Sequence, residues 1–167
     1  MRRTGFTLVE LMIVMTLLAV MALAAVPVFR TTFSTTRADH AARNLFAEIK
    51  AAQEGAVTGA VEYRIYFDKK HNTYWPARPG VTKEGRRGYL PVDVPGGEAI
   101  RVPDRLVFKD VKGRKAGAKD TFYLSFYPSG ACDAGKVTLL DSADHRRKYV
   151  IETDGARASI TFPETPR

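Results

Sequence analysis

Two hydrophobic patterns follow one another at the start of this 167-residue chain. The first is a nearly continuous apolar run from Phe6 to Phe29, interrupted in polarity only by Thr7, Glu10 and Thr16. A helix of that length reaches about 36 Å, which exceeds the hydrocarbon core of a bilayer, about 30 Å. The pattern therefore predicts a transmembrane helix over residues 6–29.

Beyond this run, apolar residues recur every three or four positions, which is typical of an amphipathic helix with one apolar stripe. Gly55 and Gly59 weaken the end of the pattern, so we expect the helix to end near Thr58. Residues 30–58 are then the amphipathic half of one long helix, and they need a folded partner. The stripe consists of Ala38, Ala41, Ala42, Leu45, Phe46, Ile49, Ala52, Ala56 and Val57.

Residues 59–167 alternate short β-branched and aromatic runs with turn residues, which predicts a β-rich globular domain. Two segments are predicted as loops: 76–98, with one short strand near 89–94, and the basic segment 111–119. The expected fold is α+β, with the outer half of the helix packed on an antiparallel β-sheet through Leu45, Phe46 and Ile49. Strands are expected at 62–68, 73–75, 100–102, 106–108, 122–127, 136–140, 149–153 and 158–162.

The leader, residues 1–5, differs from a secretory signal. A secretory signal has its small-residue cleavage site after the apolar core, whereas Gly5 precedes the apolar run here. Cleavage at Gly5 would leave the run on the mature protein. Arg2 and Arg3 are expected to hold the N-terminus in the cytoplasm, so that the bulk of the chain crosses the membrane.

Glu10 is an ionisable group inside the apolar run. Such a group costs roughly 2.5–3.5 kcal/mol at mid-bilayer and usually has a partner. The alternative is that Glu10 lies at the cytoplasmic interface, where its carboxylate reaches water.

The segment Gly5-Phe6-Thr7-Leu8-Val9-Glu10-Leu11-Met12-Ile13-Val14 resembles the N-terminus of type IV pilins and type II secretion pseudopilins. The C-terminal part resembles H-type minor pseudopilins and FimT-like minor pilins more weakly. It has a Phe126–Gly130 turn, a strand at Tyr149–Thr153 and a hairpin at Asp154–Arg157, in which Ala156 separates the usual glycine and arginine. Residues 60–120 match no pattern of these families.

The resemblance implies a pilin-like fold and a series of processing and assembly steps. A prepilin peptidase would cut after Gly5 and methylate the amine of Phe6. Subunits would then leave the inner membrane, helped by an assembly platform, and stack by their helices into a periplasmic filament with other major and minor pseudopilins. Glu10 would pair with the Phe6 amine of an adjacent subunit, a cation that exists only after cleavage. Because subunits at the very tip tend to lack this carboxylate, the chain is expected below the tip.

The net charge of +8 is unevenly distributed. Residues 64–119 hold fourteen Lys and Arg against six Asp and Glu, whereas residues 120–167 hold six against seven. With Tyr74, Trp75 and Tyr89 nearby, this region could contact the phosphates and bases of nucleic acid, as in a pilus minor pilin that takes up DNA. We favour a solvated face or one that meets an acidic neighbour. The candidate contacts are Arg86, Arg87, Lys109, Lys112, Arg114, Lys115 and Lys119.

Other candidate chemistry is weak, so we expect neither an enzyme nor a cofactor or metal. The single Cys132 cannot form a disulfide within the chain, and we expect a small buried or half-buried residue there. Asp141, Asp144 and His145 fall in a predicted turn, where such residues serve the backbone. Asp133 lacks neighbouring oxygen ligands at the spacing of a calcium site.

Overall fold

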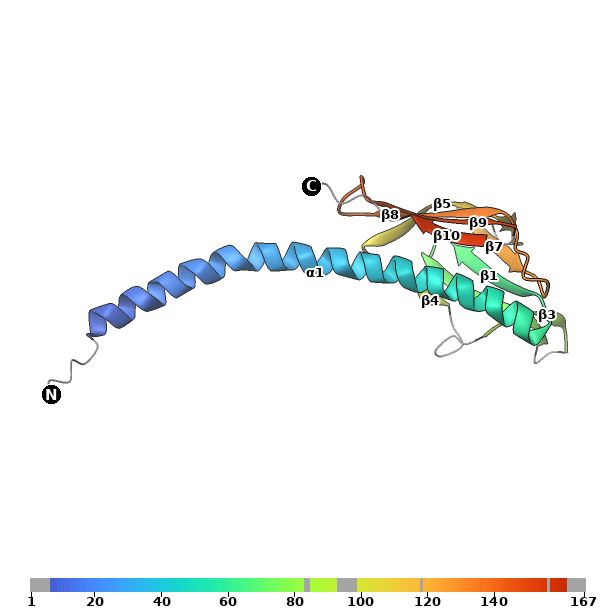
Figure 1. The fold of residues 1–167 in the computed structure, drawn as a ribbon, viewed down its shortest axis with the longest axis horizontal. Coiled ribbons are helices and arrows are strands. Elements are labelled where there is room, and N and C mark those ends of the chain that lie inside the picture. The colour runs from blue at the N-terminus through green and yellow to red at the C-terminus, as the bar shows by residue number, and fades with distance from the viewer. Residues whose placement is uncertain (1–6, 83–84, 93–98, 118, 156, 162–167) are drawn as a thin grey trace. The chain divides into compact units, whose positions relative to one another are not determined.

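The computed structural model describes residues 7–82, 85–92, 99–117, 119–155 and 157–161. In these residues one helix, α1, runs from Leu8 to Gly59, and ten strands follow it. Figure 1 shows their arrangement. The chain forms two compact units, Met1–Arg37 and Ala38–Arg167, and α1 contributes to both. The prediction of one continuous helix ending near Thr58 is confirmed to within one residue.

The first unit contains the start of α1. The large apolar side chains from Leu8 to Leu23 are 44–76% exposed. The hydroxyl of Thr16 donates to the carbonyls of Met12 (3.0 Å) and Ile13 (2.8 Å), so this polar group is satisfied within the helix itself. Among the described residues, no helix is both long enough and apolar enough to cross a membrane.

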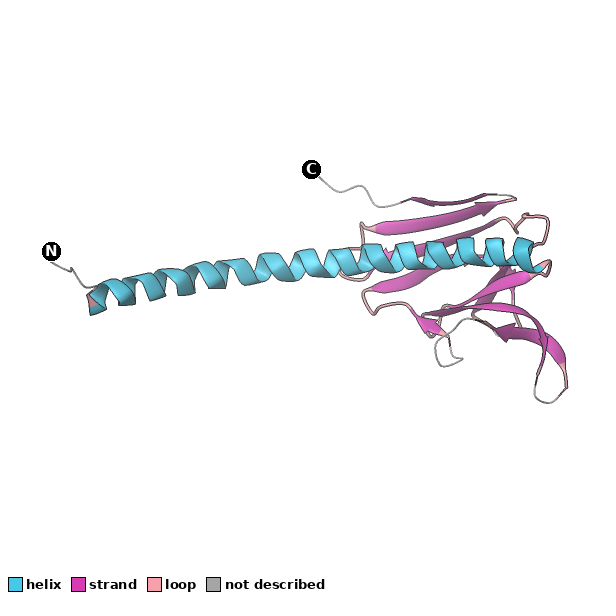
Figure 2. Ribbon diagram, turned by 60° about the horizontal axis from the view of Figure 1, so that its bottom comes forward, coloured by secondary structure: helices cyan, strands magenta, loops and turns pink. Residues whose placement is uncertain are grey.

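The second unit packs the end of α1 on two antiparallel sheets (Figure 2). The larger sheet has the order β3-β2-β1-β7-β6, with β4 paired to β2, and the smaller sheet has the order β10-β9-β8-β5. In the larger sheet the strands are β1 (Tyr63–Asp68), β2 (Thr73–Val81), β3 (Arg87–Pro91), β4 (Ile100–Arg101), β6 (Arg114–Lys115) and β7 (Thr121–Phe126). In the smaller sheet they are β5 (Leu106–Lys112), β8 (Gly135–Asp141), β9 (Lys148–Asp154) and β10 (Arg157–Thr161).

Three sequence predictions about the β domain are wrong. The strands form two sheets instead of one. Residues 76–81, expected in a loop, continue β2. Beyond Ala77, β2 no longer pairs with β1 and pairs only with β3. Pro79 therefore lies where a strand tolerates the loss of a backbone donor. The predicted loop 111–119 contains the end of β5 and all of β6.

The core joins α1 to both sheets. From α1, buried side chains come from one stripe with a spacing of three or four residues: Ala38, Ala42, Leu45, Ile49, Ala52 and Ala56. The predicted stripe is therefore largely confirmed, but Val57 is 51% exposed and Phe46 is only partly buried. The sheets contribute Ile65, Phe67, Leu106, Phe108, Leu124, Phe126, Val137, Leu139, Tyr149 and Ile151.

A partly buried polar contact joins α1 to β9 within this unit. The hydroxyl of Tyr149, which is fully buried, donates to the Asp39 carboxylate at 2.6 Å. The guanidinium of Arg147 lies 3.3 Å from the same carboxylate oxygen. Burial and the hydrogen bond to Asp39 raise the pKa of Tyr149 to about 12. A hydrogen bond is directional, whereas apolar packing between alanines and a sheet is not. The contact therefore fixes the register of α1 on the smaller sheet.

Candidate assembly site and basic surface

Glu10 lies in the first turn of α1. The preceding Thr7 caps the helix, because its hydroxyl accepts a hydrogen bond from the Glu10 backbone N–H at 3.2 Å. The carboxylate is exposed, and no ion pair of the described residues includes it. Gly5 and Phe6, the predicted processing residues, lie outside the described residues.

Sequence reasoning missed the role of Thr7, although the signal is present. Thr7 and Glu10 have the Ser/Thr-x-x-Glu spacing of a capping box at a helix start. The cap places Glu10 at a fixed position in the first turn, within a surface of exposed Leu, Ile, Val and Met side chains. A contiguous apolar surface of this kind is typical of an interaction site, so the carboxylate belongs to a surface that other apolar groups are expected to cover.

The structure separates the seven basic residues that the sequence grouped. Arg86 and Arg87 lie at β3, one edge of the larger sheet, whereas Arg114 and Lys115 form β6 at the opposite edge. Four strand spacings of about 4.8 Å place these edges about 19 Å apart. The remaining three residues, Lys109, Lys112 and Lys119, lie on β5 or shortly before β7.

Arg114 is engaged within its own chain. Its guanidinium lies 3.0 Å from the carboxylate of Asp133, and the negative charge of Asp133 raises the pKa of Arg114. Asp133 also accepts hydrogen bonds from the Tyr127 hydroxyl and the Ser125 backbone, both at 3.1 Å. The carboxylate is thus a structural acceptor, and the described residues contain no group of three or more His, Cys, Asp or Glu suited to a metal.

The aromatic residues near the basic region divide between two faces. Tyr74 is 5% exposed and belongs to the core, so it is not accessible to a nucleobase. Trp75 lies on the outer face of the larger sheet, stacked on Tyr66 with ring centroids 5.4 Å apart and planes 6° apart. Trp75 therefore packs against its cross-strand neighbour on this face.

Arg64 organises the same outer face and was missed by sequence reasoning. Its guanidinium carbon lies 3.7 Å from the ring centroid of Tyr89 and 4.5 Å from that of Tyr123. Its Nε atom lies 2.9 Å from a carboxylate oxygen of Glu62. These π-faces are therefore occupied by a cation of the same chain. The alternation of polar and apolar residues along 62–68 indicates that Arg64 lies on the outer face. Its contacts with Tyr89 and Tyr123, however, depend on which strands pair with β1.

Two further predictions about candidate chemistry are confirmed. Cys132 is buried, with 6% of its surface exposed. The Asp141 turn serves the backbone, because the carboxylate accepts hydrogen bonds from the N–H groups of Ala143 (2.9 Å) and Asp144 (3.3 Å). Both oxygens of Asp141 also accept from Arg105 Nε, at 2.9 and 2.8 Å.

Known proteins resemble this chain both in its N-terminal sequence and in its fold. Residues 1–26 match the prokaryotic N-terminal methylation motif. The fold is similar to the minor pseudopilin EpsH of the Vibrio cholerae type 2 secretion system, at 11% identity with a TM-score of 0.59, covering 77% of this chain and 99% of that one. This is a pilin-like fold with a prepilin-type N-terminus. The α+β expectation is confirmed.

Two other solved structures share the pilin-like fold. Escherichia coli GspH is 15% identical, with a TM-score of 0.58, and covers 77% of this chain and 89% of its own. The Pseudomonas aeruginosa type IV minor pilin FimU is 16% identical, with a TM-score of 0.50, and covers 74% and 87%. No curated protein sequence matches the chain. At these identities the similarity concerns the fold alone.

The C-terminal pattern of the pilin-like domain appears as expected. The Phe126–Gly130 segment ends β7 in a turn that Gly130 closes with a φ of 83°. The Cys132 N–H then donates to the Gly155 carbonyl, and Gly155 has a φ of 59° at the β9–β10 hairpin. Positive φ favours glycine at both turns. The sequence signal at these two positions is therefore a backbone requirement.

Proposed function

We propose that this chain is a minor pseudopilin of a type II secretion system, of H type. The observation that carries the proposal is the combination of a methylation motif over residues 1–26 with a fold similar to EpsH over 99% of that chain. Its role is structural and not enzymatic: it occupies a position near the tip of a periplasmic filament that helps to move folded proteins through the outer membrane.

We propose that the chain is first inserted into the inner membrane. Residues 1–5 are the leader, residues 6–29 form the membrane and assembly helix, residues 30–58 the amphipathic half, and residues 59–167 the periplasmic domain. Arg2 and Arg3 orient the leader toward the cytoplasm. Prepilin peptidase cuts between Gly5 and Phe6 and methylates the new amine, which lowers the net charge from +8 to +6.

Glu10 makes assembly depend on cleavage. In a filament the exposed apolar surface around Glu10 is covered by other helices, so a lone carboxylate there would be neutralised or would need a cation. The Phe6 amine of a neighbouring subunit supplies that cation only after the leader has gone. Removing one partner of a buried pair costs about 3–5 kcal/mol, which is enough to exclude an unprocessed or mutant subunit.

Two substitutions test this proposal. Gly5→Ala is expected to leave the chain unprocessed in the membrane, and to abolish secretion in a strain that depends on this subunit. Glu10→Ala is expected to be cleaved normally but absent from filaments. Glu10→Gln is the matched control for side-chain size, and it should fail as Glu10→Ala does because it lacks the charge. Normal filament incorporation of both Glu10 variants would refute the pairing.

The similarity to FimU favours a second candidate, a minor pilin of a type IV pilus. Partners would then be pilins, and DNA binding or uptake would be an accessory role of that system. Deletion of the subunit separates the two candidates. Loss of exported proteins from the medium with normal pili supports the secretion role, whereas loss of pili or of competence with normal secretion supports the pilus role.

A further inference from the structure

We propose that three exposed lysines, Lys109, Lys112 and Lys115, form a docking surface for carboxylates on a neighbouring filament subunit. We call this the β5–β6 lysine surface. The inference rests on the proposed function and adds to it the side of the domain that meets a neighbour, and the chemistry of that contact. Seven residues of strand-like chain carry the three ammonium groups, so their Cα atoms span at most about 20 Å.

The ion pairs between described residues of the domain do not include these three lysines. All three side chains are exposed, and none takes part in an ion pair with another described residue. Of the nearby acids, Asp133 binds Arg114 and Glu152 binds Lys136 at 2.6 Å, whereas Asp110, between Lys109 and Lys112 in β5, takes part in none of these ion pairs. The ion pairs between described residues are Arg64–Glu62, His71–Asp68, Arg105–Asp141, Arg114–Asp133, Lys136–Glu152 and Arg147–Asp39.

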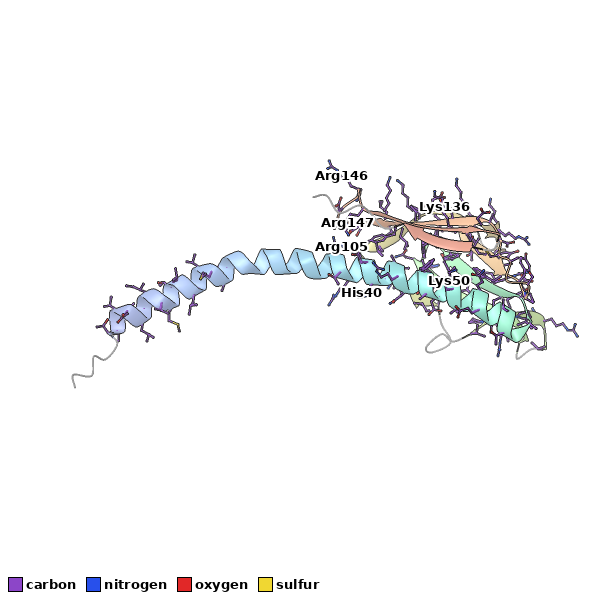
Figure 3. All side chains as sticks on the ribbon, viewed as in Figure 1. His40, Lys50, Arg105, Lys136, Arg146 and Arg147 are labelled. Carbon is purple, nitrogen blue, oxygen red and sulfur yellow. The ribbon has the colours of Figure 1, made fainter. Side chains whose placement is uncertain are left out.

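Strand pairing places two like charges opposite each other at this surface. Lys112 on β5 is the direct cross-strand partner of Lys136 on β8. Like charges in this position destabilise a sheet pair. Glu152 on β9 neutralises Lys136, which Figure 3 shows at the outer side of the smaller sheet, and Lys112 keeps its charge. A carboxylate supplied from outside could pair with the charge that Lys112 retains.

The backbone that carries the lysines is held closely. At Gly113 the chain leaves the smaller sheet for the larger one, and a Cβ there would lie 2.8 Å from the carbonyl oxygen of Tyr123. A Cβ at Gly135 would lie 2.8 Å from the carbonyl oxygen of Lys112. The segment between Lys112 and Lys115 is further fixed by the Arg114–Asp133 pair. Docking on a fixed backbone loses little conformational entropy.

The arrangement of charges favours a protein partner over nucleic acid. A hollow of about 430 Å³ beside Lys112 is lined by acidic Glu152 and Asp154 as well as by Lys136. Duplex DNA carries a charge about every 1.7 Å and would bring phosphates against these acids. A folded protein partner can place single carboxylates beside the lysines without bringing charge against Glu152 and Asp154. The cations are lysines, which act as point charges, whereas forked phosphate recognition favours arginine.

Binding of a defined carboxylate polymer gives the first test. The full-length chain in detergent is titrated with fluorescent poly-L-glutamate at low salt. The variant Lys109→Gln/Lys112→Gln/Lys115→Gln should bind about tenfold more weakly, because three charges on one surface are lost. The control Lys70→Gln/Arg86→Gln/Arg146→Gln removes three exposed charges elsewhere, and it should bind as the parent does. Equal weakening in both variants, or tighter binding of the parent to duplex DNA of equal charge, would overturn the proposal.

Filament assembly gives the second test. Lys112→Glu/Lys115→Glu should be processed at Gly5 but incorporated into filaments several-fold less than the parent. Acid-to-lysine substitutions in another filament subunit should restore incorporation. Unchanged incorporation, or suppressors confined to this chain, would contradict the docking surface. If Glu10→Ala fails to assemble while the lysine variant assembles normally, only the surface is wrong. If both assemble normally, the proposed function is wrong as well.

Discussion

The two halves of α1 have opposite relations to their own chain. From Leu8 to Leu23, the large apolar side chains are at least 44% exposed, and the polar Thr16 is satisfied by its own helix. From Ala38 to Gly59, the apolar side chains are mostly small, and one stripe of them is buried against two sheets. We name these segments the apolar half and the packed half.

The two halves obtain their stability from different sources. The packed half is stabilised by tertiary contacts within the domain, and its alanines let the sheets approach the helix closely. The apolar half has no such contacts among the described residues, and a surface of this kind is typical of an interaction site. Under the proposed function, one helix contains a folding element and an assembly element, so substitutions should affect either the domain or the assembly.

The largest effect should come from a leucine truncated in each half. Leu45 is 1% exposed, whereas Leu17 is 61% exposed. Leu45→Ala should lower the free energy of unfolding of the domain by about 2–5 kcal/mol, because it leaves a cavity. Leu17→Ala should change it by less than about 0.5 kcal/mol. Denaturant unfolding of the full chain in detergent measures both, and equal losses would erase the distinction between the halves.

Enlarging an alanine should separate two faces of the packed half. Ala52 is 3% exposed, whereas the adjacent Ala51 is exposed. Ala52→Leu should destabilise the domain by about 1–3 kcal/mol through overpacking. Ala51→Leu, the matched control, should be nearly neutral in the same unfolding measurement. A neutral Ala52→Leu would mean that the sheets do not fit the helix as closely as the structure indicates.

Removing the Tyr149 hydroxyl should have a moderate effect that depends on pH. Tyr149→Phe loses the hydrogen bond to Asp39 and should destabilise the domain by about 0.5–1.5 kcal/mol at neutral pH. The folded-state pKa is raised to about 12, above the unfolded value of about 10. Its contribution is therefore fully present below pH about 10 and is lost as pH rises toward 12.

Alkaline unfolding curves check this sign. The parent should lose stability between pH 10 and 12 more steeply than Tyr149→Phe does. Tyr74 and Tyr89, whose pKa values burial also raises to about 12, should leave part of the slope in the variant. Parallel curves for parent and variant would show that the ionisation of Tyr149 does not oppose folding.

The smallest effect should be confined to the start of the apolar half. Thr7→Ala removes the helix cap and should weaken the first turn by about 1 kcal/mol. Amide hydrogen exchange should become faster near Glu10 and Leu11, with no change in the unfolding of the domain. Thr16→Ala is the control within the same half, since its hydroxyl bonds only to the preceding turn. Unchanged exchange near Glu10 would contradict the cap.

The helix was predictable because its signal is local. Periodicity of apolar residues located the stripe from Ala38 to Ala56, and two weak helix formers located its end. Most strands were also predicted to within a residue or two. The extension of β2 to Val81 was not, because Pro76, Pro79 and Gly80 indicate a loop by local preference. Only the pairing with β3 makes that segment a strand.

Side-chain partners across strands could not be predicted from the sequence either, because they also depend on strand pairing. The contacts of Arg64 with Tyr89 and Tyr123 join residues 25 and 59 positions apart, and register alone brings them together. The basic residues were grouped by their closeness in sequence, whereas sheet order puts Arg87 and Arg114 at opposite edges. The processing and assembly residues rest on a contiguous motif, and Gly5, Phe6 and Glu10 remain predictions for the experiments above.

Trp75 gives the molecule a built-in optical reporter. It is the only tryptophan of the chain, and it lies half-buried beside Tyr66 on the outer face of the larger sheet. Its emission therefore reports the polarity at a single site, without the averaging that several indoles would cause. Light absorbed by nearby tyrosines can reach it by energy transfer. Unfolding separates these rings, so the same signal distinguishes a folded subunit from an unfolded one without any added label.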